Sequence, residues 1–263
     1  RALITIAGKP FDESCFFFIP SGEYTIGMDE GDIPRYEQLA NLKPAYFLAS
    51  APRHHRFLEA FAISKWLVTA SDFARFVGET GYVTDAEKEG WAWLLLNGQW
   101  KKIEGLSWKK PFGNEADAIY HAQDNRLPVL HTSWNDAHEY CRWLSSECAQ
   151  RVHIPTEVQW EAYAKACCIP SMKSVNDLDI SPAREFRDDV AYLRVFDELM
   201  DEAGNCSSGV LWEWSDDWYD AYPGGVPNRE FGRVYKVLRG GSLFSHPLQR
   251  TREYRFRRCP TAR

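Results

Sequence analysis

The stretch PVLHTSWNDAHEYCRWL, residues 128–144, carries the clearest structural signal of the chain. Ser133 stands three positions before Asp136, the spacing at which two side chains cap a helix N-terminus by each accepting a backbone hydrogen bond from the other residue. Apolar side chains then recur at i, i+3, i+4 and i+7: Ala137, Tyr140, Cys141 and Leu144. This spacing places them on one face of an α-helix, so the stretch predicts an amphipathic helix that begins after Ser133.

The same capping signal predicts two further helices. TASD places Thr69 before a helix that ends at Gly81, and IPTEVQW places Thr156 before a helix with Gln159 in its first turn. Apolar runs bounded by turn residues predict strands in FFFIPSGEYTIG (16–27), FLEAFAIS (57–64) and GRVYKVLRGG (232–241). The order of these segments predicts an α+β fold with few helices and short strands.

Composition indicates a globular protein in which residues 1–263 form one domain. The chain is 44% hydrophobic and 26% charged, with no internal repeat and no apolar run of the roughly eighteen residues that a membrane span requires. The net charge of −6 argues against general nucleic-acid binding. Seven cysteines without a CxxC pair favour a reducing compartment, so we expect a cytoplasmic protein; the oligomeric state is not indicated.

Six stretches, taken in order, resemble the formylglycine-generating enzyme family, also called the sulfatase-modifying-factor family. They are FFFIPSGEYTIGMDE (16–30), FAISKWLVTASDFARFVGETGYVTDAEKEGW (61–91), PVLHTSWNDAHEYCRWL (128–144), IPTEVQWEAYAKA (154–166), GVLWEWSDDWY (209–219) and VLRGGS (237–242). The resemblance implies a loop-rich α+β domain with a C-type-lectin-like core, short antiparallel sheets and a ligand cleft close to the RGGS segment.

The resemblance also shows what this chain lacks. The family's founding activity oxidises a cysteine of a sulfatase peptide to formylglycine, with copper held by two cysteines shortly after GGS. Here the corresponding positions are Ser245 and Arg250. Copper(I) requires soft thiolate ligands, whereas a serine hydroxyl is a poor ligand and a guanidinium repels a cation. We therefore expect a divergent member without formylglycine activity.

The residues around the RGGS segment are the candidates for a site. His246 lies at the family's cleft position and could act as a general base or as a ligand for a transition metal, Fe or Cu, with Ser242 and Ser245 as the nearest hydroxyls. The alternative is a histidine that only holds the loop. Substrate-binding candidates are the aromatic pair Trp214 and Trp218 and the cations Arg250 and Arg252, for which the alternatives are core packing and core ion pairs.

A calcium site is a second hypothesis that rests on the resemblance. In relatives the segment matching CSSGVLWEW (206–214) supplies a side-chain ligand, two carbonyls and the glutamate. Cys206 stands at the side-chain position here, while Glu213 is retained. The two interpretations are a weakened Ca²⁺ site and a glutamate that holds only protein groups.

Other histidines carry less weight. His54 and His55 are adjacent, and adjacent side chains of a strand point to opposite faces, so both rings could bind one metal only at a bulge. We predict that His131 and His153 are structural.

Two functions from different classes remain. Stand-alone relatives without the cysteine pair are associated with oxidative steps in the pyoverdine and toxoflavin pathways, which implies an oxidoreductase acting on a small molecule in natural-product biosynthesis. The alternative is a catalytically inactive lectin-like binding module. Because a histidine, hydroxyls and tryptophans surround the RGGS segment, the sequence favours the enzyme.

Overall fold

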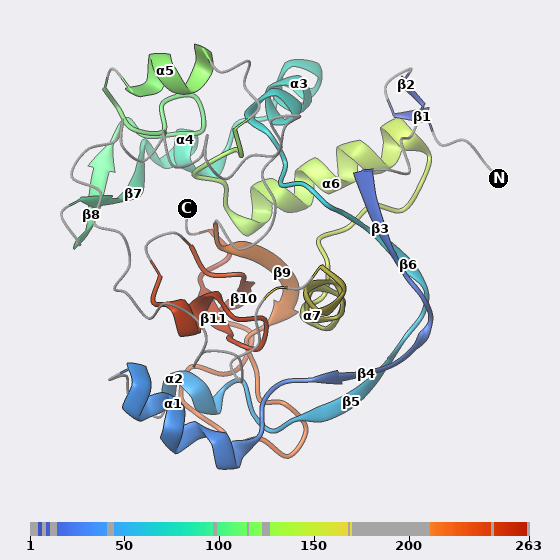
Figure 1. Cartoon of the computed structure of the whole chain (residues 1–263). Helices are drawn as coiled ribbons and strands as arrows, with labels where there is room; N and C mark the ends of the chain where they lie inside the picture. Colours follow the sequence, from blue (N-terminus) through green and yellow to red (C-terminus); the bar gives the residue numbers. More distant parts are fainter. Residues whose placement is uncertain are drawn as a thin grey trace.

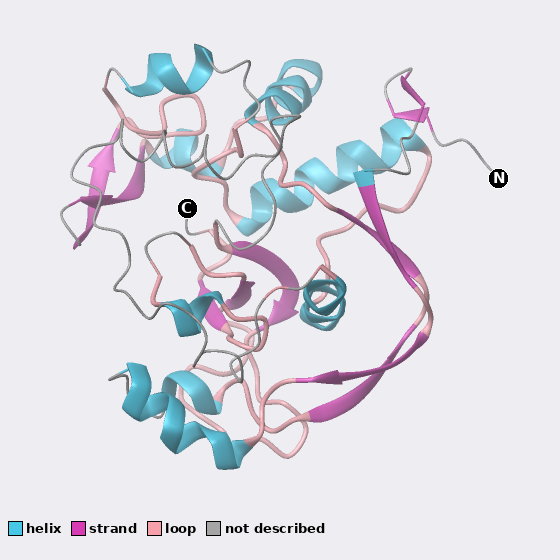
Figure 2. Cartoon of the chain, viewed as in Figure 1, coloured by secondary structure: helices cyan, strands magenta, loops and turns pink. Residues whose placement is uncertain are grey.

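The structure, a computed structural model, describes residues 5–6, 9–10, 15–40, 45–96, 99–114, 116–122, 127–167, 169, 211–242 and 245–261. Within them, helices and short antiparallel strands are joined by long irregular segments (Figure 2). The predicted α+β, loop-rich fold class is confirmed. Among these residues no helix is both long and apolar enough to cross a membrane.

The strands pair only in small antiparallel sheets. In chain order they are β1 (Thr5–Ile6), β2 (Lys9–Pro10), β3 (Phe16–Ile19), β4 (Gly22–Ile26), β5 (His54–Leu58), β6 (Phe61–Ser64), β7 (Trp91–Leu96), β8 (Gln99–Glu104), β9 (Glu213–Trp218), β10 (Lys236–Arg239) and β11 (Phe256–Arg258). β3 pairs with β6 and β4 with β5, so the two pairs form one curved ribbon (Figure 1). All three predicted strand segments are confirmed.

A three-stranded sheet in the order β11-β10-β9 lies at the centre of the molecule (Figure 1). All four residues of β10 are buried. Lys236 pairs with Trp218 and Leu238 with Trp214, so β9 bulges opposite Val237. The RGGS segment therefore begins at the end of a fully buried central strand, which fixes its first residue in the core.

The helices are α1 (Ile33–Ala40), α2 (Ala45–Leu48), α3 (Ala70–Thr80), α4 (Asp85–Glu89), α5 (Ala116–Ala122), α6 (Trp134–Cys148) and α7 (Glu157–Ala166), with 3-10 turns η2 (Glu30–Asp32) and η4 (Pro247–Arg250). Thr69, Ser133 and Thr156 cap α3, α6 and α7 as predicted, each in a reciprocal capping box. α3 ends at Gly81, whose φ of 67° suits glycine. The three predicted helices are confirmed.

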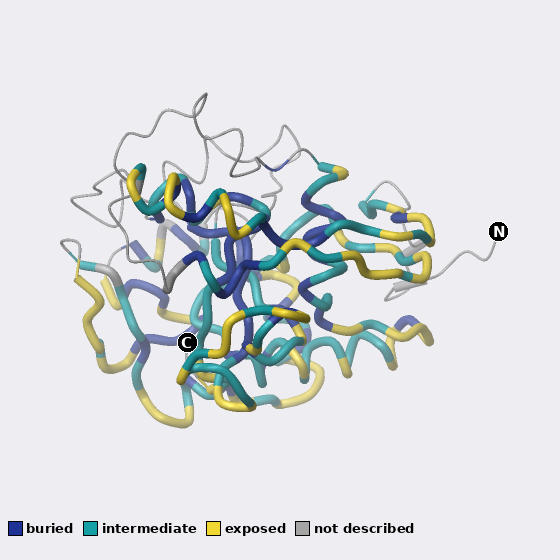
Figure 3. The backbone as a smooth tube through the Cα atoms, turned by 90° about the horizontal axis from the view of Figure 1, so that it is seen from below, coloured by how far each residue is buried: buried dark blue, intermediate teal, exposed yellow. Residues whose placement is uncertain are grey.

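α7 connects the ribbon to the central sheet and has the most buried positions of the helices among the described residues. Trp160 and Glu161 are fully buried, and the Tyr163 ring lies 5.3 Å from that of Phe17 on β3. A separate cluster joins α3 to α6 through Phe73, Phe76 and their aromatic neighbours. Figure 3 shows the buried backbone running through the middle of the molecule, with exposed residues at the outer turns.

His131, His54 and His55 behave as predicted. His131 is held at a φ of 55°, and its Nε2 lies 2.8 Å from the carbonyl oxygen of Pro111. Burial lowers the pKa of His131 to about 4, so the ring is neutral near pH 7. On β5, the ring of His54 packs on Tyr222 while His55 lies near Thr25, which separates the two imidazoles.

Candidate functional site

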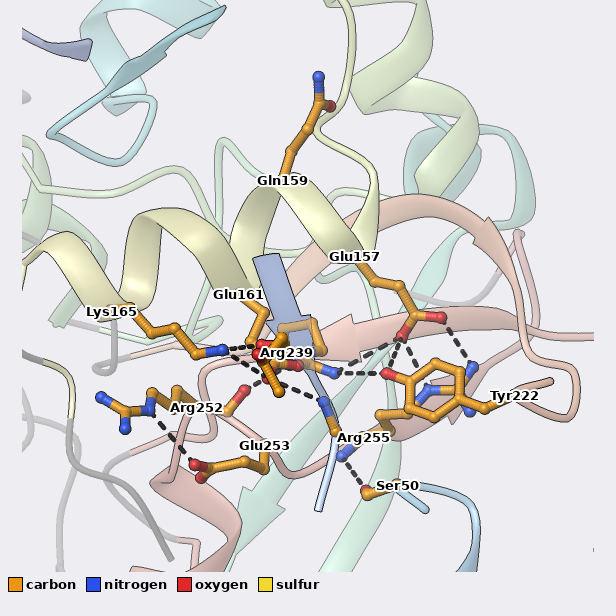
Figure 4. Close-up of polar contacts among 12 residues, drawn as sticks. Ser50, Glu157, Gln159, Glu161, Lys165, Tyr222, Arg239, Arg252, Glu253 and Arg255 are labelled. Carbon is orange, nitrogen blue, oxygen red and sulfur yellow. Dashed lines mark hydrogen bonds and ion pairs between the residues drawn. The ribbon is translucent and has the colours of Figure 1, made fainter. Parts of the chain in front are cut away.

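The first residue of the RGGS segment is held by a buried ion pair. Arg239 is fully buried, and its Nη2 donates a 2.6 Å hydrogen bond to Oε2 of Glu161 on α7. The other oxygen of Glu161 accepts a 3.0 Å hydrogen bond from the backbone N–H of Gly27. Burial raises the pKa of Glu161, and the positive charge of Arg239 opposes that shift. Figure 4 shows these side chains converging between α7 and the strands.

A second arginine repeats this arrangement. Arg255 donates from Nε and Nη2 to the two oxygens of Glu157, each at 2.8 Å, in a bidentate pair (Figure 4). Its backbone N–H donates to the Ser50 hydroxyl, and its guanidinium lies 4.1 Å from the ring centroid of Tyr222. The arginines that follow RGGS in the sequence thus include one, Arg255, that forms a core ion pair.

Glycine is required where the segment passes the next turn. Gly241 has a φ of 73°, and a Cβ placed there would lie 2.8 Å from Cα of Arg250. No side chain tolerates that contact with backbone, so Gly241 lets the RGGS chain lie directly against η4. The position of Arg250, one of the two thiolate positions of the family, is therefore close to the GGS backbone.

The hydroxyls of Ser242 and Ser245 close a tight turn on each other. The two Oγ atoms are 3.0 Å apart, Ser245 Oγ accepts a 3.0 Å hydrogen bond from the backbone N–H of Ser242, and the N–H of Ser245 donates to the Ser242 carbonyl. Both residues are buried. Within the described part of the chain neither hydroxyl contacts an imidazole, amine or carboxylate that could activate it as a nucleophile.

His246 caps η4. The ring Nδ1 of His246 accepts a 3.2 Å hydrogen bond from the backbone N–H of Leu248. The backbone N–H of His246 donates to the side-chain oxygen of Gln249. A backbone N–H can only donate, so Nδ1 carries no proton and a neutral ring must carry it on Nε2. Burial lowers the pKa of His246, which favours this neutral form. In this capped form Nε2–H is a hydrogen-bond donor, and neither nitrogen has a free lone pair for a base or a metal.

The side chains present do not fit a copper centre. Ser245 is bound within its turn, and Arg250 is exposed on η4 with a cationic side chain. Among the described residues no cluster of three or more histidine, cysteine, aspartate or glutamate side chains could hold a metal ion. Among the residues that the structure describes, none therefore completes a transition-metal site with His246.

Arg252 lies beside the buried ion pairs. Its Nε is 3.2 Å from Oε1 of Glu253, and its backbone carbonyl accepts a hydrogen bond from Arg239. Its side chain is 27% exposed, which leaves part of it accessible. Of the two cations predicted to bind substrate, Arg250 is thus the more exposed.

The two candidate tryptophans lie on a strand, although their spacing of four residues is also that of a helix face. Trp214 and Trp218 both belong to β9, where the bulge alters the local register. Trp214 donates from Nε1 to the carbonyl of Thr132. The Nζ of Lys236 lies 4.3 Å from the ring centroid of Trp218 and 4.1 Å from that of Trp134, so a cation already occupies the face between these two rings.

Glu213 holds the indole of Trp160. The Nε1 of Trp160, which is fully buried on α7, donates a 3.1 Å hydrogen bond to Oε2 of Glu213. The Cβ position at Gly240 is 3.2 Å from Oε1, so the carboxylate packs closely against the RGGS backbone. Cys206 and its neighbours lie outside the described residues, and the calcium site remains a prediction.

Sequence reasoning missed two features of this region. It did not find Glu157 and Glu161 as the partners of Arg255 and Arg239, because those contacts span 98 and 78 positions of the chain. It also left open the capping role of His246, although SHPLQ places a proline directly after a residue able to accept a hydrogen bond and a glutamine three positions later, as a capping box requires.

The family model and the curated relatives that match this chain all belong to one family. The model of the sulfatase-modifying factor enzyme 1-like domain matches residues 7–191. The formylglycine-generating enzyme of Bos taurus is 30% identical over 171 residues, covering 59% of this chain and 40% of that protein, and the enzyme of Streptomyces coelicolor is 29% identical over 233 residues, covering 74% and 71%. The inactive C-alpha-formylglycine-generating enzyme 2 of Mus musculus is 29% identical over 163 residues, covering 56% and 46%.

Solved structures agree in fold. PvdO from Pseudomonas aeruginosa superposes with a TM-score of 0.59 at 18% identity, covering 94% of this chain and 89% of that one. Variable protein 1 of Treponema denticola superposes with a TM-score of 0.52 at 13% identity, covering 98% and 93%. At these identities the likeness shows the fold alone. The chain spans about two fifths of the length of the mammalian formylglycine-generating enzymes that it matches.

Proposed function

Because the chain belongs to the sulfatase-modifying factor enzyme 1-like family, we propose that it is a member that binds a small molecule beside its RGGS segment without generating formylglycine. The observation that carries this proposal is the side-chain replacement at the two thiolate positions, Ser245 and Arg250. Cysteine oxidation by copper requires two facing thiolates, and these residues supply neither.

Binding without catalysis follows from how the remaining polar groups are used. Ser242, Ser245 and His246 are committed to hydrogen bonds that shape the turn. A group whose lone pair already accepts a backbone hydrogen bond must break that bond before it can take a proton. The segment is therefore a rigid scaffold, anchored by Arg239, and a rigid scaffold lowers the entropy cost of binding. The relative named as inactive, from Mus musculus, supports a non-catalytic member in this family.

A second candidate is an oxidoreductase that acts on a small molecule in a natural-product pathway. The observation in its favour is the Nε2–H of His246, which the cap does not use and which could donate to a developing negative charge. Fold likeness to PvdO over most of the chain is compatible with this candidate. A redox metal would require ligands beyond the described residues.

The first experiment tests for formylglycine activity by measuring products and oxygen together. The purified chain is incubated with copper and a cysteine-containing sulfatase peptide, and aldehyde is measured by mass spectrometry while oxygen uptake is recorded. The Streptomyces coelicolor enzyme serves as the active control. We expect no aldehyde and no oxygen uptake. Aldehyde formed at catalytic turnover would refute the proposal that the chain does not generate formylglycine.

Small-molecule binding is tested separately by thermal shift against a metabolite library, with oxygen uptake measured for every compound that raises the melting temperature. The proposal expects stabilising compounds that are recovered unchanged. A compound that is oxidised by the wild-type chain and not by His246→Ala would establish the oxidoreductase instead. A library without any stabilising compound would count against a ligand site at this segment.

A further inference from the structure

The cap of η4 depends on a single lone pair of His246. We call the hydrogen bond from the backbone N–H of Leu248 to the ring Nδ1 of His246 the His246 cap. A protonated imidazole carries a hydrogen on both nitrogens and has no lone pair left to accept with. Rotation of the ring cannot restore the acceptor, because either edge then presents an N–H to the N–H of Leu248. Protonation of His246 therefore breaks the His246 cap in every ring orientation.

The donor of this hydrogen bond lies in the core. Leu248 is fully buried, and its side chain belongs to a hydrophobic cluster with Phe47 and Tyr254. Within the described chain the backbone N–H of Leu248 has Nδ1 of His246 as its acceptor and no other. A buried N–H that loses its acceptor destabilises the structure around it until it reaches water or another acceptor. Loss of the His246 cap therefore favours opening of η4.

The remaining hydrogen bonds of this turn do not depend on the ring proton. The side chain of Gln249 accepts a 3.1 Å hydrogen bond from the backbone N–H of His246 and donates to the hydroxyl of Tyr254 at 3.3 Å. The hydroxyl of Thr251 donates a 2.8 Å hydrogen bond to the carbonyl of Leu248. Because these contacts persist when His246 is charged, its protonation loosens η4 without unfolding the protein.

The RGGS segment rests directly on η4. A Cβ placed at Gly241 would lie 2.8 Å from the carbonyl oxygen of Gln249 and 2.8 Å from Cα of Arg250, so backbone packs against backbone there. The two segments are also joined by the tight turn in which the N–H of Ser245 donates to the carbonyl of Ser242. No side chain of Gly241 separates the two backbones, so movement of η4 changes the support of the RGGS segment.

The proton on His246 is opposed mainly by burial. Burial lowers the pKa of His246 below the ordinary histidine value of about 6.5, and no charged group of the described chain contributes to this shift. The aliphatic stem of Arg250, the charged residue of η4, lies against Gly241. The other ionisable groups of the neighbouring segments are engaged with partners: Arg239 with Glu161, Arg252 with Glu253, and Tyr254 with Gln249.

We propose that the His246 cap is a proton-sensitive control of the RGGS segment: the cap holds η4 closed near neutral pH, and protonation of the ring opens it as the pH falls. The stabilisation that the cap contributes is thus present while the ring is neutral and is lost in acid. The effect on ligands rests on the proposed function: a looser η4 supports the RGGS segment less rigidly, so a small molecule bound beside it binds more weakly in acid.

The test measures the cap itself, by NMR on the full chain labelled with ¹⁵N-leucine and ¹⁵N-histidine. Ring ¹⁵N shifts near pH 7.5 should show the proton of His246 on Nε2. Protection of the Leu248 amide against hydrogen exchange, corrected for the intrinsic effect of pH, should fall about fivefold between pH 7.5 and pH 5, as the loss of one capping hydrogen bond gives. The fall should follow the titration of the His246 ring.

Substitutions at one position separate the cap from a general effect of acid. His246→Asn keeps a side-chain oxygen that accepts a hydrogen bond and takes up no proton in this range, so Leu248 should be protected equally at both pH values. His246→Ala removes the acceptor, so protection should be low at both. His138→Gln removes an exposed imidazole on α6 and should retain the wild-type dependence on pH.

Three results would overturn the proposal: a proton on Nδ1 of His246 near pH 7.5, equal protection of wild-type Leu248 at the two pH values, or a wild-type dependence on pH in His246→Asn. The first two need no variant, so they decide the question even where a substituted chain fails to fold. All these measurements are made without a ligand, and failure of the proposed function leaves them unchanged.

Discussion

Glu161→Gln tests whether the buried ion pair anchors the RGGS segment. Glu161 uses both oxygens: Oε1 accepts from the backbone N–H of Gly27 and Oε2 from Nη2 of Arg239. Glutamine has one oxygen and one amide NH₂, so in either orientation a donor faces a donor. The substitution also removes the nearest negative charge from a guanidinium that is fully buried.

The magnitude follows from the burial of both partners. Breaking a buried ion pair by removing one charge costs about 3–5 kcal/mol, because the remaining charge stays desolvated. For a chain of this size that corresponds to a fall in melting temperature of roughly 6–15 °C. Glu139→Gln is the matched control, since it makes the same change in a pair with Arg142 whose side chains are 35% and 67% exposed. An exposed pair contributes about 0–1 kcal/mol.

The assay is urea unfolding followed by circular dichroism near pH 7, with both variants compared with the wild type. The ion-pair argument requires Glu161→Gln to lose several times more free energy of unfolding than Glu139→Gln. Similar losses in the two variants would refute the reasoning and would show that Arg239 finds sufficient compensation in Glu157, Tyr222 and the carbonyl of Arg252.

The other predictions concern His131 and Glu213. Because burial lowers the pKa of His131 to about 4 while an unfolded histidine has a pKa of about 6.5, the unfolded chain binds more protons between these values and stability falls as pH falls through that range. Asparagine is tolerated at positive φ, so His131→Asn should keep the backbone. The free energy of unfolding of the wild type should fall by about 2 kcal/mol more than that of this variant between pH 7 and about pH 5. An equal dependence of the unfolding free energy on pH in the two proteins, measured by urea unfolding, would contradict the prediction. Glu213→Ala should cost about 1–3 kcal/mol because Trp160 Nε1 loses its acceptor, and melting with and without EDTA shows whether calcium adds to this role; a neutral substitution would be the contrary result.

Local signals predicted the parts of the fold that depend on neighbouring residues. The capping boxes at Thr69, Ser133 and Thr156 were readable because each helix start is determined within four positions. Thr84 and Glu87 form the same box before α4, with Gly90 at its end, so that short helix could have been found in the same way. Helix starts of this kind need no knowledge of the tertiary structure.

The candidate site was less predictable because its geometry depends on distant partners. The positions of Ser242, Ser245 and His246 followed from the family resemblance, but which atoms they bond did not. Ser245 could equally have faced a ligand, and only the approach of Gly241 to Arg250 shows how closely the turn is folded.

The contacts of Arg255 affect the order in which the protein can fold during synthesis. Its backbone N–H and its side chain bond to Ser50 and Ala49, at separations of 205 and 206 positions. Contacts of such high sequence separation form late, since a long loop must close before they are gained. Until Arg255 has left the ribosome, Glu157 lacks its bidentate partner and has only the longer 3.5 Å contact with Arg239. The charged core is therefore complete only in a chain that extends through Arg255.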